Sequence, residues 1–248
     1  FVDDGSTDGT KKVFERFEPL LKAKFGQERI TYIFQENKGV CSATNLGYKY
    51  SRGGYIVPCD SDDIMLPGKI DAHIDCFSRN PDAGAVYSDS YICEEKSLRI
   101  LKRKFAYWKS PPSSAGVYDA LLINGFFMGS ASTYCFRKEC LKFLPGGKLN
   151  EKYHGQNLEL LLYISFHRKI VFHSDITVCI IKRVGSLEHQ RQAKLKDTEP
   201  KESEITLDVI DKLGCSKETR RRMLKRHWSK VLRYHFFVTQ DPKYVRRS

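Results

Sequence analysis

The first 90 residues alternate short apolar runs with stretches of helical pattern, and this alternation is the strongest constraint on the fold. Residues 30–34, 55–59 and 85–88 are largely apolar and have the length and composition of strands. Between such runs, apolar residues recur at helical spacing, as over residues 13–21. Strands and helices that alternate with short links predict an α/β fold, in which helices flank a mostly parallel sheet.

Acidic side chains follow several of these runs. Asp3 and Asp4 follow the apolar start of the chain. The sequence DSDD at 60–63 follows the run at 55–59, and Asp89 follows the run at 85–88. The carboxyl ends of parallel strands line the ligand-binding edge of such sheets. Carboxylates that are this close repel one another unless a partner neutralises them. Mg²⁺ or Mn²⁺ does so, usually together with substrate phosphates. The plain alternative is a solvated turn that caps the next helix.

The remaining sequence is less regular. Residues 95–115 are basic and predict a hairpin or loop that reaches over the site, and residues 117–170 predict further helices. Residues 171–182 predict another strand. Residues 188–204 are polar and charged, which is typical of a linker, and a basic amphipathic helix is predicted over 217–238.

The charge balance is basic, with 42 Lys and Arg against 30 Asp and Glu and a formal net charge of +12. This fits a polyanion, a phosphorylated small molecule or an anionic membrane surface as partner. No RNA-binding motif or helix-turn-helix signature accompanies the charge, so we expect no nucleic-acid partner. The eight cysteines show no C-x-x-C spacing and no export signal is visible. We therefore expect reduced thiols and a cytoplasmic location.

Four motifs identify a family when they are read in order. They are VDDGSTDGT at 2–10, ENKGVCSATN at 36–45, YIVPCDSDDIMLPGKI at 55–70 and NPDAGAVYSD at 80–89. Together they resemble the family 2 glycosyltransferases of the GT-A fold, of the bacterial polysaccharide type. The resemblance is strong over residues 1–90 and looser to about 190. It implies a Rossmann-like GT-A domain over 1–190, followed by a basic helical extension over 191–248.

The resemblance implies a nucleotide-binding role for five residues. Asp3 and Asp4 match family positions that contact the base and ribose of the nucleotide. Asn37 and Lys38 match a loop beside the nucleotide, and Asp60 would contact the ribose or the sugar.

The resemblance also implies a metal site, with Mn²⁺ or Mg²⁺ as the cofactor. Asp62 would bind the ion that bridges the donor diphosphate. His189 is the candidate third ligand, with an ordinary loop histidine as the equal alternative. A bound cation stabilises the departing diphosphate as a Lewis acid.

The catalytic base is less clear, because the family carries an acidic pair where this chain has Gln156 and Asn157. An amide cannot accept a proton at neutral pH, so Asn157 cannot simply take over that role. Glu159 and Asp89 are the nearest carboxylate candidates. Asp89 is slightly preferred because it ends a strand at the active edge.

The family also begins with a strand and helix before the first motif, and the sequence begins within that motif. We therefore expect that an N-terminal piece of the natural chain precedes residue 1. That strand would lie at the centre of the sheet.

The sequence as a whole predicts a metal-dependent glycosyltransferase. It would move a hexosyl or N-acetylhexosaminyl group from a nucleotide sugar, UDP-linked by expectation, to a hydroxyl of a glycan or lipid-linked glycan, with inversion. The alternative is a catalytically weak or inactive relative that binds sugar nucleotides or glycans. The basic helix near the C-terminus has two interpretations. One is peripheral contact with the inner face of a membrane, and the other, which is preferred, is docking on the domain or on a second subunit of a homodimer.

Overall fold

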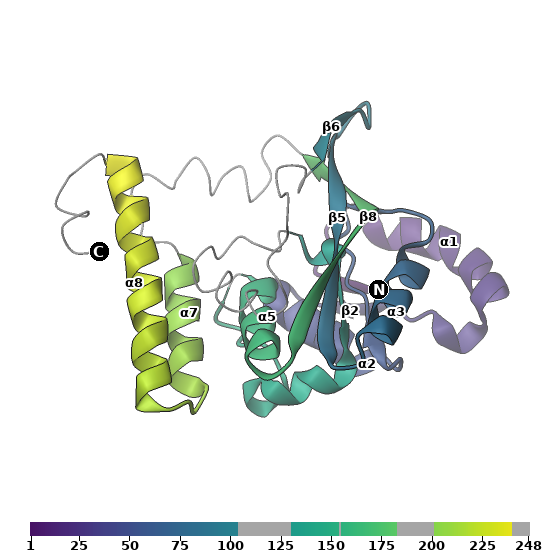
Figure 1. Ribbon diagram of the computed structural model, residues 1–248. Coiled ribbons are helices and arrows are strands. Elements are labelled where there is room, and N and C mark those ends of the chain that lie inside the picture. The colour runs from purple at the N-terminus through teal and green to yellow at the C-terminus, as the bar shows by residue number, and fades with distance from the viewer. Residues whose placement is uncertain (104–129, 154, 183–200, 240–248) are drawn as a thin grey trace.

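The computed structural model describes residues 1–103, 130–153, 155–182 and 201–239. It is a mixed α/β structure, in which a central sheet lies between helices (Figure 1). The strands are β1 (Val2–Asp4), β2 (Ile33–Gln35), β3 (Tyr55–Ile56), β4 (Ile64–Met65), β5 (Ala83–Glu94), β6 (Ile100–Arg103), β7 (Tyr134–Arg137) and β8 (Lys169–Lys182). The helices are α1 (Thr10–Phe25), α2 (Val40–Tyr50), α3 (Lys69–Arg79), α5 (Gln156–His167), α7 (Lys201–Lys212) and α8 (Lys217–Thr239).

The described strands form two sheets. β1 and β2 pair in parallel as a two-stranded sheet, and the larger sheet has the order β3-β7-β5-β8-β4, with β6 paired to β5. In the larger sheet β5 and β8 run parallel, whereas the pairs β3–β7, β5–β7, β4–β8 and β5–β6 are antiparallel. The predicted α/β class is confirmed, but the strand directions are more mixed than the mostly parallel sheet that the sequence predicted.

The antiparallel strand β7 accounts for much of this difference. It lies between β3 and β5, within a region where the sequence pattern predicted helices. Its four residues, Tyr-Cys-Phe-Arg, are buried except for the last, which is partly buried. A short apolar run cannot be assigned to a buried strand or a buried helix from periodicity alone, and here the sheet determined the outcome.

The two faces of the central sheet bury separate apolar clusters. Ala85 and Tyr87 of β5 belong to a large cluster with α5, while Val86 between them packs with Cys76 and Phe77 of α3. This alternation is the period of two that a strand imposes on its side chains. Because elements cover both faces of β5, residues 83–90 are all buried, including the polar side chains of Ser88, Asp89 and Ser90.

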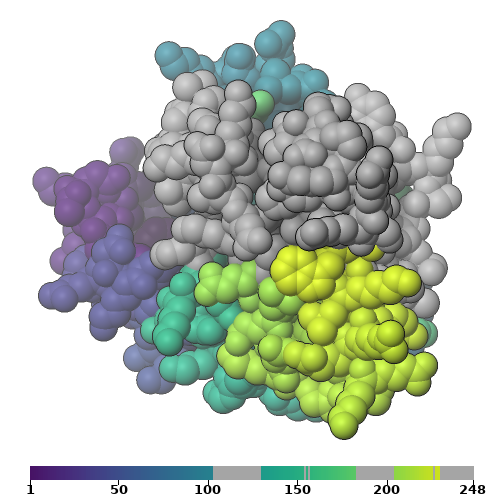
Figure 2. Space-filling view, turned by 90° about the vertical axis from the view of Figure 1, so that its left-hand side faces the viewer, coloured from purple at the N-terminus to yellow at the C-terminus, as the bar shows by residue number. Residues whose placement is uncertain are grey.

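The C-terminal helices extend the larger cluster. Ile205, Val209 and Ile210 of α7 and Met223 of α8 are buried in the same core as α5. Figure 1 shows α7 and α8 side by side beyond α5, on the side of the sheet away from α1. Figure 2 shows that the two helices form the lower part of the face turned toward the viewer. In the described chain, no helix has both the length and the apolarity that crossing a membrane requires.

Gly84 lies where α5 packs closely on the sheet, so a substitution there tests this packing. A Cβ atom at Gly84 would lie 2.8 Å from both Arg168 Cβ and Ile164 Cγ2. Overpacking of this kind costs about 1–3 kcal/mol. We therefore expect Gly84→Ala to lower the melting temperature by about 3–10 °C in thermal unfolding. Gly54→Ala is the matched control, because nothing lies within 4 Å of its Cβ position. Equal melting temperatures for the two variants would contradict this packing.

Candidate active site

The first aspartate of the chain is held by two hydrogen bonds. Asp3 lies in β1 and is 3% exposed. Its Oδ1 accepts a hydrogen bond from the Ser6 backbone N–H at 2.8 Å, and its Oδ2 accepts one from the Tyr32 hydroxyl. The bonds from Tyr32 and Ser6 lower the pKa of Asp3, and the same contact raises the pKa of Tyr32 to about 12. Asp3 is therefore ionised at neutral pH and fixed in orientation.

The second aspartate shapes the loop that carries Asn37 and Lys38. Asp4 Oδ1 accepts the Lys38 backbone N–H at 2.9 Å, and Asp4 Oδ2 accepts that of Gly39 at 3.0 Å. Gly5 lets this loop come close, because a Cβ there would lie 2.7 Å from the Asn37 backbone nitrogen and its φ is +81°. The structure thus brings four of the predicted nucleotide-binding residues together at the end of β1.

The aspartates at 60–63 form a second acidic group. The Asp63 N–H donates to the Asp60 carbonyl at 3.1 Å, which closes a turn with Ser61 and Asp62 at its exposed tip. At the base of the turn, Ser130 Oγ lies 2.9 Å from Asp60 Oδ2 and 2.5 Å from Asp63 Oδ2. The structure therefore presents Asp62 outward on a turn whose two ends are tied together.

Burial raises the pKa of Asp60, and the neighbouring charges of Asp63 and Asp62 raise it further, against the hydrogen bond from Ser130. Such a group of hard oxygen ligands suits Mg²⁺ or Mn²⁺. Within residues that the structure describes, no three His, Cys, Asp or Glu side chains come together as a metal site. The turn therefore fits a cation that substrate phosphates help to coordinate. His189, the predicted third ligand, lies outside the described residues.

Asn157 accepts a hydrogen bond from a buried tyrosine. The Tyr134 hydroxyl donates to Asn157 Oδ1 at 2.8 Å. Burial raises the pKa of Tyr134 well above its usual value, and the charges of Tyr48 and Asp60 add to the shift. The side chain of Asn157 is thus an acceptor for a buried phenol that lies near Asp60.

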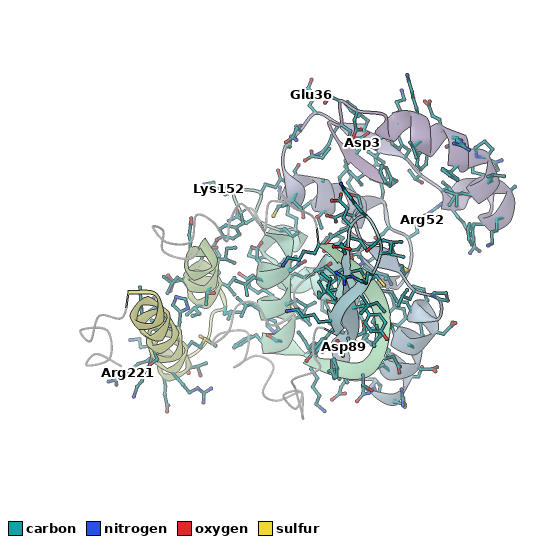
Figure 3. All side chains as sticks on the ribbon, turned by 90° about the horizontal axis from the view of Figure 1, so that it is seen from above. Asp3, Glu36, Arg52, Asp89, Lys152 and Arg221 are labelled. Atoms are coloured by element: carbon teal, nitrogen blue, oxygen red, sulfur yellow. The ribbon has the colours of Figure 1, made fainter. Side chains whose placement is uncertain are left out.

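The two carboxylates considered as the base are both buried. Asp89 is 1% exposed, and its Oδ1 accepts the Ser90 N–H at 2.7 Å. Glu159 is 2% exposed, and its Oε2 accepts the Asn150 N–H at 2.9 Å. Burial raises the pKa of Glu159. Figure 3 shows Asp3 on the β1 side of the molecule and Asp89 within the central sheet, so the view does not bring these two together.

Sequence reasoning missed two side chains of the site. Ser130 and Tyr134 lie in or next to β7, within the region predicted to be helical. No sequence signal near them marks a contact with the 60–63 turn, because that contact spans about seventy positions of the chain. Asp63 is part of the DSDD motif, and only the turn geometry separates its role from that of Asp62.

An acidic turn after a strand of a mixed sheet, with helices on both faces, is the arrangement of a GT-A glycosyltransferase domain. A TarS fragment (residues 1–349) from S. aureus, crystallised with UDP-GlcNAc, superposes with a TM-score of 0.62 at 16% identity, over 95% of this chain and 62% of that one. The mannosyltransferase PcManGT from Pyrobaculum calidifontis, in complex with GDP-Man and Mn²⁺, gives 0.53 at 15% identity, over 91% of this chain and 58% of the other. These likenesses establish the fold.

The sequence comparisons give the family. The model of glycosyl transferase family 2 matches residues 1–140, so the chain belongs to that family. The chondroitin synthase of Escherichia coli is 35% identical over 35% of this chain and 12% of its own length. The putative colanic acid biosynthesis glycosyl transferase WcaA of E. coli K12 is 28% identical over 56% of this chain and 47% of its own. The chain thus spans less than half the length of either relative.

Substitutions at Glu159 test whether its carboxylate is chiefly a buried hydrogen-bond acceptor. Glu159→Gln keeps an oxygen for the Asn150 N–H and removes a buried charge. A carboxyl whose folded pKa is raised contributes stability that is complete below the unfolded pKa near ~4.3 and is lost as the pH rises through the higher folded pKa. We therefore expect Glu159→Gln to melt at or above the wild-type temperature at neutral pH, with the difference shrinking as the pH falls.

Glu159→Ala is the contrasting variant, because it leaves the Asn150 N–H without its acceptor. An unsatisfied buried donor costs about 1–3 kcal/mol, so we expect the melting temperature to fall by roughly 2–10 °C. Equal destabilisation by Gln and Ala would show that the ionised carboxylate itself holds this region together.

Proposed function

We propose that the protein is a metal-dependent glycosyltransferase that moves a sugar from a UDP-linked donor to a hydroxyl of a glycan or lipid-linked glycan, with inversion of the anomeric centre. Membership of glycosyl transferase family 2 supports the reaction class. The two E. coli relatives, a chondroitin synthase and a putative colanic acid enzyme, support a polysaccharide acceptor. The TarS fragment, which shares the fold, was crystallised with UDP-GlcNAc, which motivates the choice of UDP.

The observation that carries the proposal is the geometry of the 60–63 turn. Its tip is exposed and holds Asp62, while its base is fixed by Ser130 through Asp60 and Asp63. An anionic donor approaches such a site only with a cation, because its phosphates would otherwise meet carboxylates of like charge. Mn²⁺ or Mg²⁺, when bound there, supplies a Lewis acid that stabilises the departing diphosphate.

The residues at the end of β1 suit the nucleoside part of the donor. Asp4 fixes the loop of Asn37 and Lys38 through two backbone N–H groups, so that loop is ordered before a ligand arrives. Asp3 has one hydrogen bond on each carboxylate oxygen, and an ionised carboxylate has acceptor sites to spare for a base or ribose. Because it is 3% exposed, it would have to become accessible when the donor binds. Preorganisation of this kind lowers the entropy lost on binding.

Asp89 and Glu159 are the two candidates for the base that takes the proton from the attacking hydroxyl. A general base must come within hydrogen-bond reach of the hydroxyl from which it takes the proton. The sequence favours Asp89 as the residue that ends a strand, but it lies inside β5, which continues to Glu94. As the base it would have to gain access when substrates bind, since it is 1% exposed. The alternative function, a weak or inactive sugar-nucleotide-binding relative, is favoured by Asn157, whose amide replaces a carboxylate and already accepts from Tyr134.

Ligand-dependent unfolding tests the donor and the metal together. With UDP-sugar and Mn²⁺ both near 100 times their dissociation constants, a ligand that binds only the folded state adds about 2.7 kcal/mol. That corresponds to a rise of about 5–10 °C in melting temperature. We expect the rise for UDP-sugars with Mn²⁺ and not with EDTA, and we expect Asp62→Asn to abolish it. A rise that EDTA leaves intact would contradict the metal dependence.

Asp75→Asn is the matched control for that experiment, because Asp75 is an exposed aspartate on α3, outside the turn. It removes the same charge and should keep the full ligand-dependent rise. Turnover separates the two functions: sugar transfer or donor hydrolysis with Mn²⁺ supports the enzyme, whereas UDP binding without turnover across donors and acceptors supports the binding relative.

We also propose that α8 contacts the anionic, cytoplasmic face of a membrane, where a lipid-linked acceptor would be presented. Lys217, Arg220, Arg221 and Lys225 line a hollow on α8 together with Leu224. Figure 3 shows Arg221 at the end of the molecule farthest from α1. Met223 faces the core, so α8 docks on the domain by one side and directs cations outward by another. Basic residues near an anionic leaflet contribute about 1 kcal/mol each.

Charge reversal on α8 tests the membrane contact. We expect the triple variant Lys217→Glu, Arg221→Glu, Lys225→Glu to lower partitioning onto vesicles of equal phosphatidylglycerol and phosphatidylcholine by roughly 100-fold in flotation. The control reverses three exposed lysines of α1, with Lys11→Glu, Lys12→Glu and Lys24→Glu, and should retain more of the binding. Negligible binding of the wild-type protein to these vesicles would contradict the proposal.

A further inference from the structure

We propose that Ser130 is the positioning residue for the metal-binding turn: its hydroxyl holds Asp60 and Asp63 together and thereby sets the direction in which Asp62 meets the cation. The inference rests on the proposed function, since it concerns the metal of that reaction. Ser130 itself lies behind the turn, so we assign it no contact with metal or donor.

The Ser130 hydroxyl contacts both ends of the turn at residues 60–63. Ser130 Oγ reaches Asp60 at 2.9 Å and Asp63 at 2.5 Å, so a single hydroxyl contacts both ends of a four-residue turn. A backbone hydrogen bond of 3.1 Å from the Asp63 N–H to the Asp60 carbonyl closes the same loop. With both ends fixed, the intervening Asp62 has little freedom to change direction.

Ser130 is itself held in place by hydrogen bonds from the residues that follow it. The Ser132 N–H donates to Ser130 Oγ at 3.0 Å, and the Thr133 N–H donates to the Ser130 carbonyl at 3.1 Å. The Asp60 N–H donates to Ser132 Oγ at 2.8 Å, so the two segments are joined by backbone as well as side-chain groups. The hydroxyl therefore occupies a fixed position relative to the turn.

The buried side chain of Lys69 also contacts the 130–133 segment. Lys69 is 1% exposed, and its ammonium donates to the Ser132 carbonyl. Burial lowers the pKa of Lys69 to about 8, while the charge of Asp63 counts among those that act in the opposite direction. A buried lysine is costly unless it is hydrogen-bonded, so the bond from Lys69 to the Ser132 carbonyl also fixes the 130–133 segment.

Removal of the Ser130 hydroxyl is expected to release the two carboxylates. Two carboxylates that face one hydroxyl repel each other, and the single hydrogen of that hydroxyl is shared between them as a bifurcated donor. In Ser130→Ala they would turn apart toward water, and the tip would follow. Groups that orient metal ligands typically change metal affinity by about 10–100-fold when they are removed.

The experiment measures Mn²⁺ binding directly, by the electron paramagnetic resonance signal of free Mn²⁺ in the presence of UDP. We expect Ser130→Ala to weaken Mn²⁺ binding about tenfold or more. Ser130→Thr should restore most of the affinity, because it keeps the hydroxyl and Ser130 has an extended backbone that suits a β-branched residue. Activity assays should show a matching rise in the Mn²⁺ concentration needed for half-maximal rate.

Ser88→Ala is the control that separates positioning from general stability. Ser88 is fully buried, and its Oγ contacts the same segment at the Thr133 carbonyl, at 3.3 Å, but no described bond joins it to the turn. We expect it to lower the melting temperature and leave Mn²⁺ affinity unchanged. Equal loss of affinity in Ser88→Ala and Ser130→Ala, or unchanged affinity in Ser130→Ala, would overturn the inference while the wild-type protein still binds Mn²⁺. A wild-type protein that binds no Mn²⁺ with UDP would overturn the proposed function as well.

Discussion

The repulsion between carboxylates that share one small turn is the constraint on which the candidate site depends. Two like charges about 4 Å apart repel by about 1 kcal/mol in water and about 4 kcal/mol at an effective dielectric constant of 20. The protein offsets this with donors drawn from distant parts of the chain: the hydroxyl of Ser130, and the N–H of Ile181 at 3.2 Å from Asp63 Oδ1. The turn exists in this form because β7 and β8 bring those donors to it.

β5 is the element that makes the meeting possible. It pairs with β8 from Ala83 to Glu94, which is its whole length, and with β7 on the other side over residues 85–87. β4 follows the acidic turn directly and pairs with β8 at Ile64 and Met65. The chain thus leaves β3, forms the turn, and is immediately fixed to the strand that supplies the Ile181 donor. The site is an outcome of strand pairing, and its local sequence supplies only the carboxylates.

The carboxylates come from local sequence and their donors come from strand pairing, and this difference explains what the sequence could predict. Motifs such as DSDD, and the period-two and helical patterns of the first 90 residues, are local, and they gave the α/β class, the family resemblance and the acidic turn at the end of β3. Strand direction, the position of β7 between β3 and β5, and the contact of Ser130 with Asp60 depend on pairing between residues far apart in the chain. A single sequence carries no direct signal for such pairing.

At Asn157, too, the sequence alone could not predict the contact that the side chain makes. From the sequence, an amide in place of a carboxylate argues only that a proton acceptor is lost. In the structure its oxygen accepts from the buried Tyr134 hydroxyl, which a carboxylate oxygen could also do. The position therefore has a supporting role that does not require a charge.

The C-terminal helices add a constraint on the helix that carries Asn157 and Glu159. The Tyr153 hydroxyl donates to Asp208 of α7 at 2.5 Å, and Ile205 and Val209 of the same helix pack in the core shared with α5. α5 is thus fixed between the central sheet and α7. The predicted boundary at residue 190 separates stretches of sequence that differ in motif content, but the apolar core runs across it. Any change in α7 packing would therefore reach Asn157 through α5, which gives the extension a structural part in the site even though none of its described residues lies there.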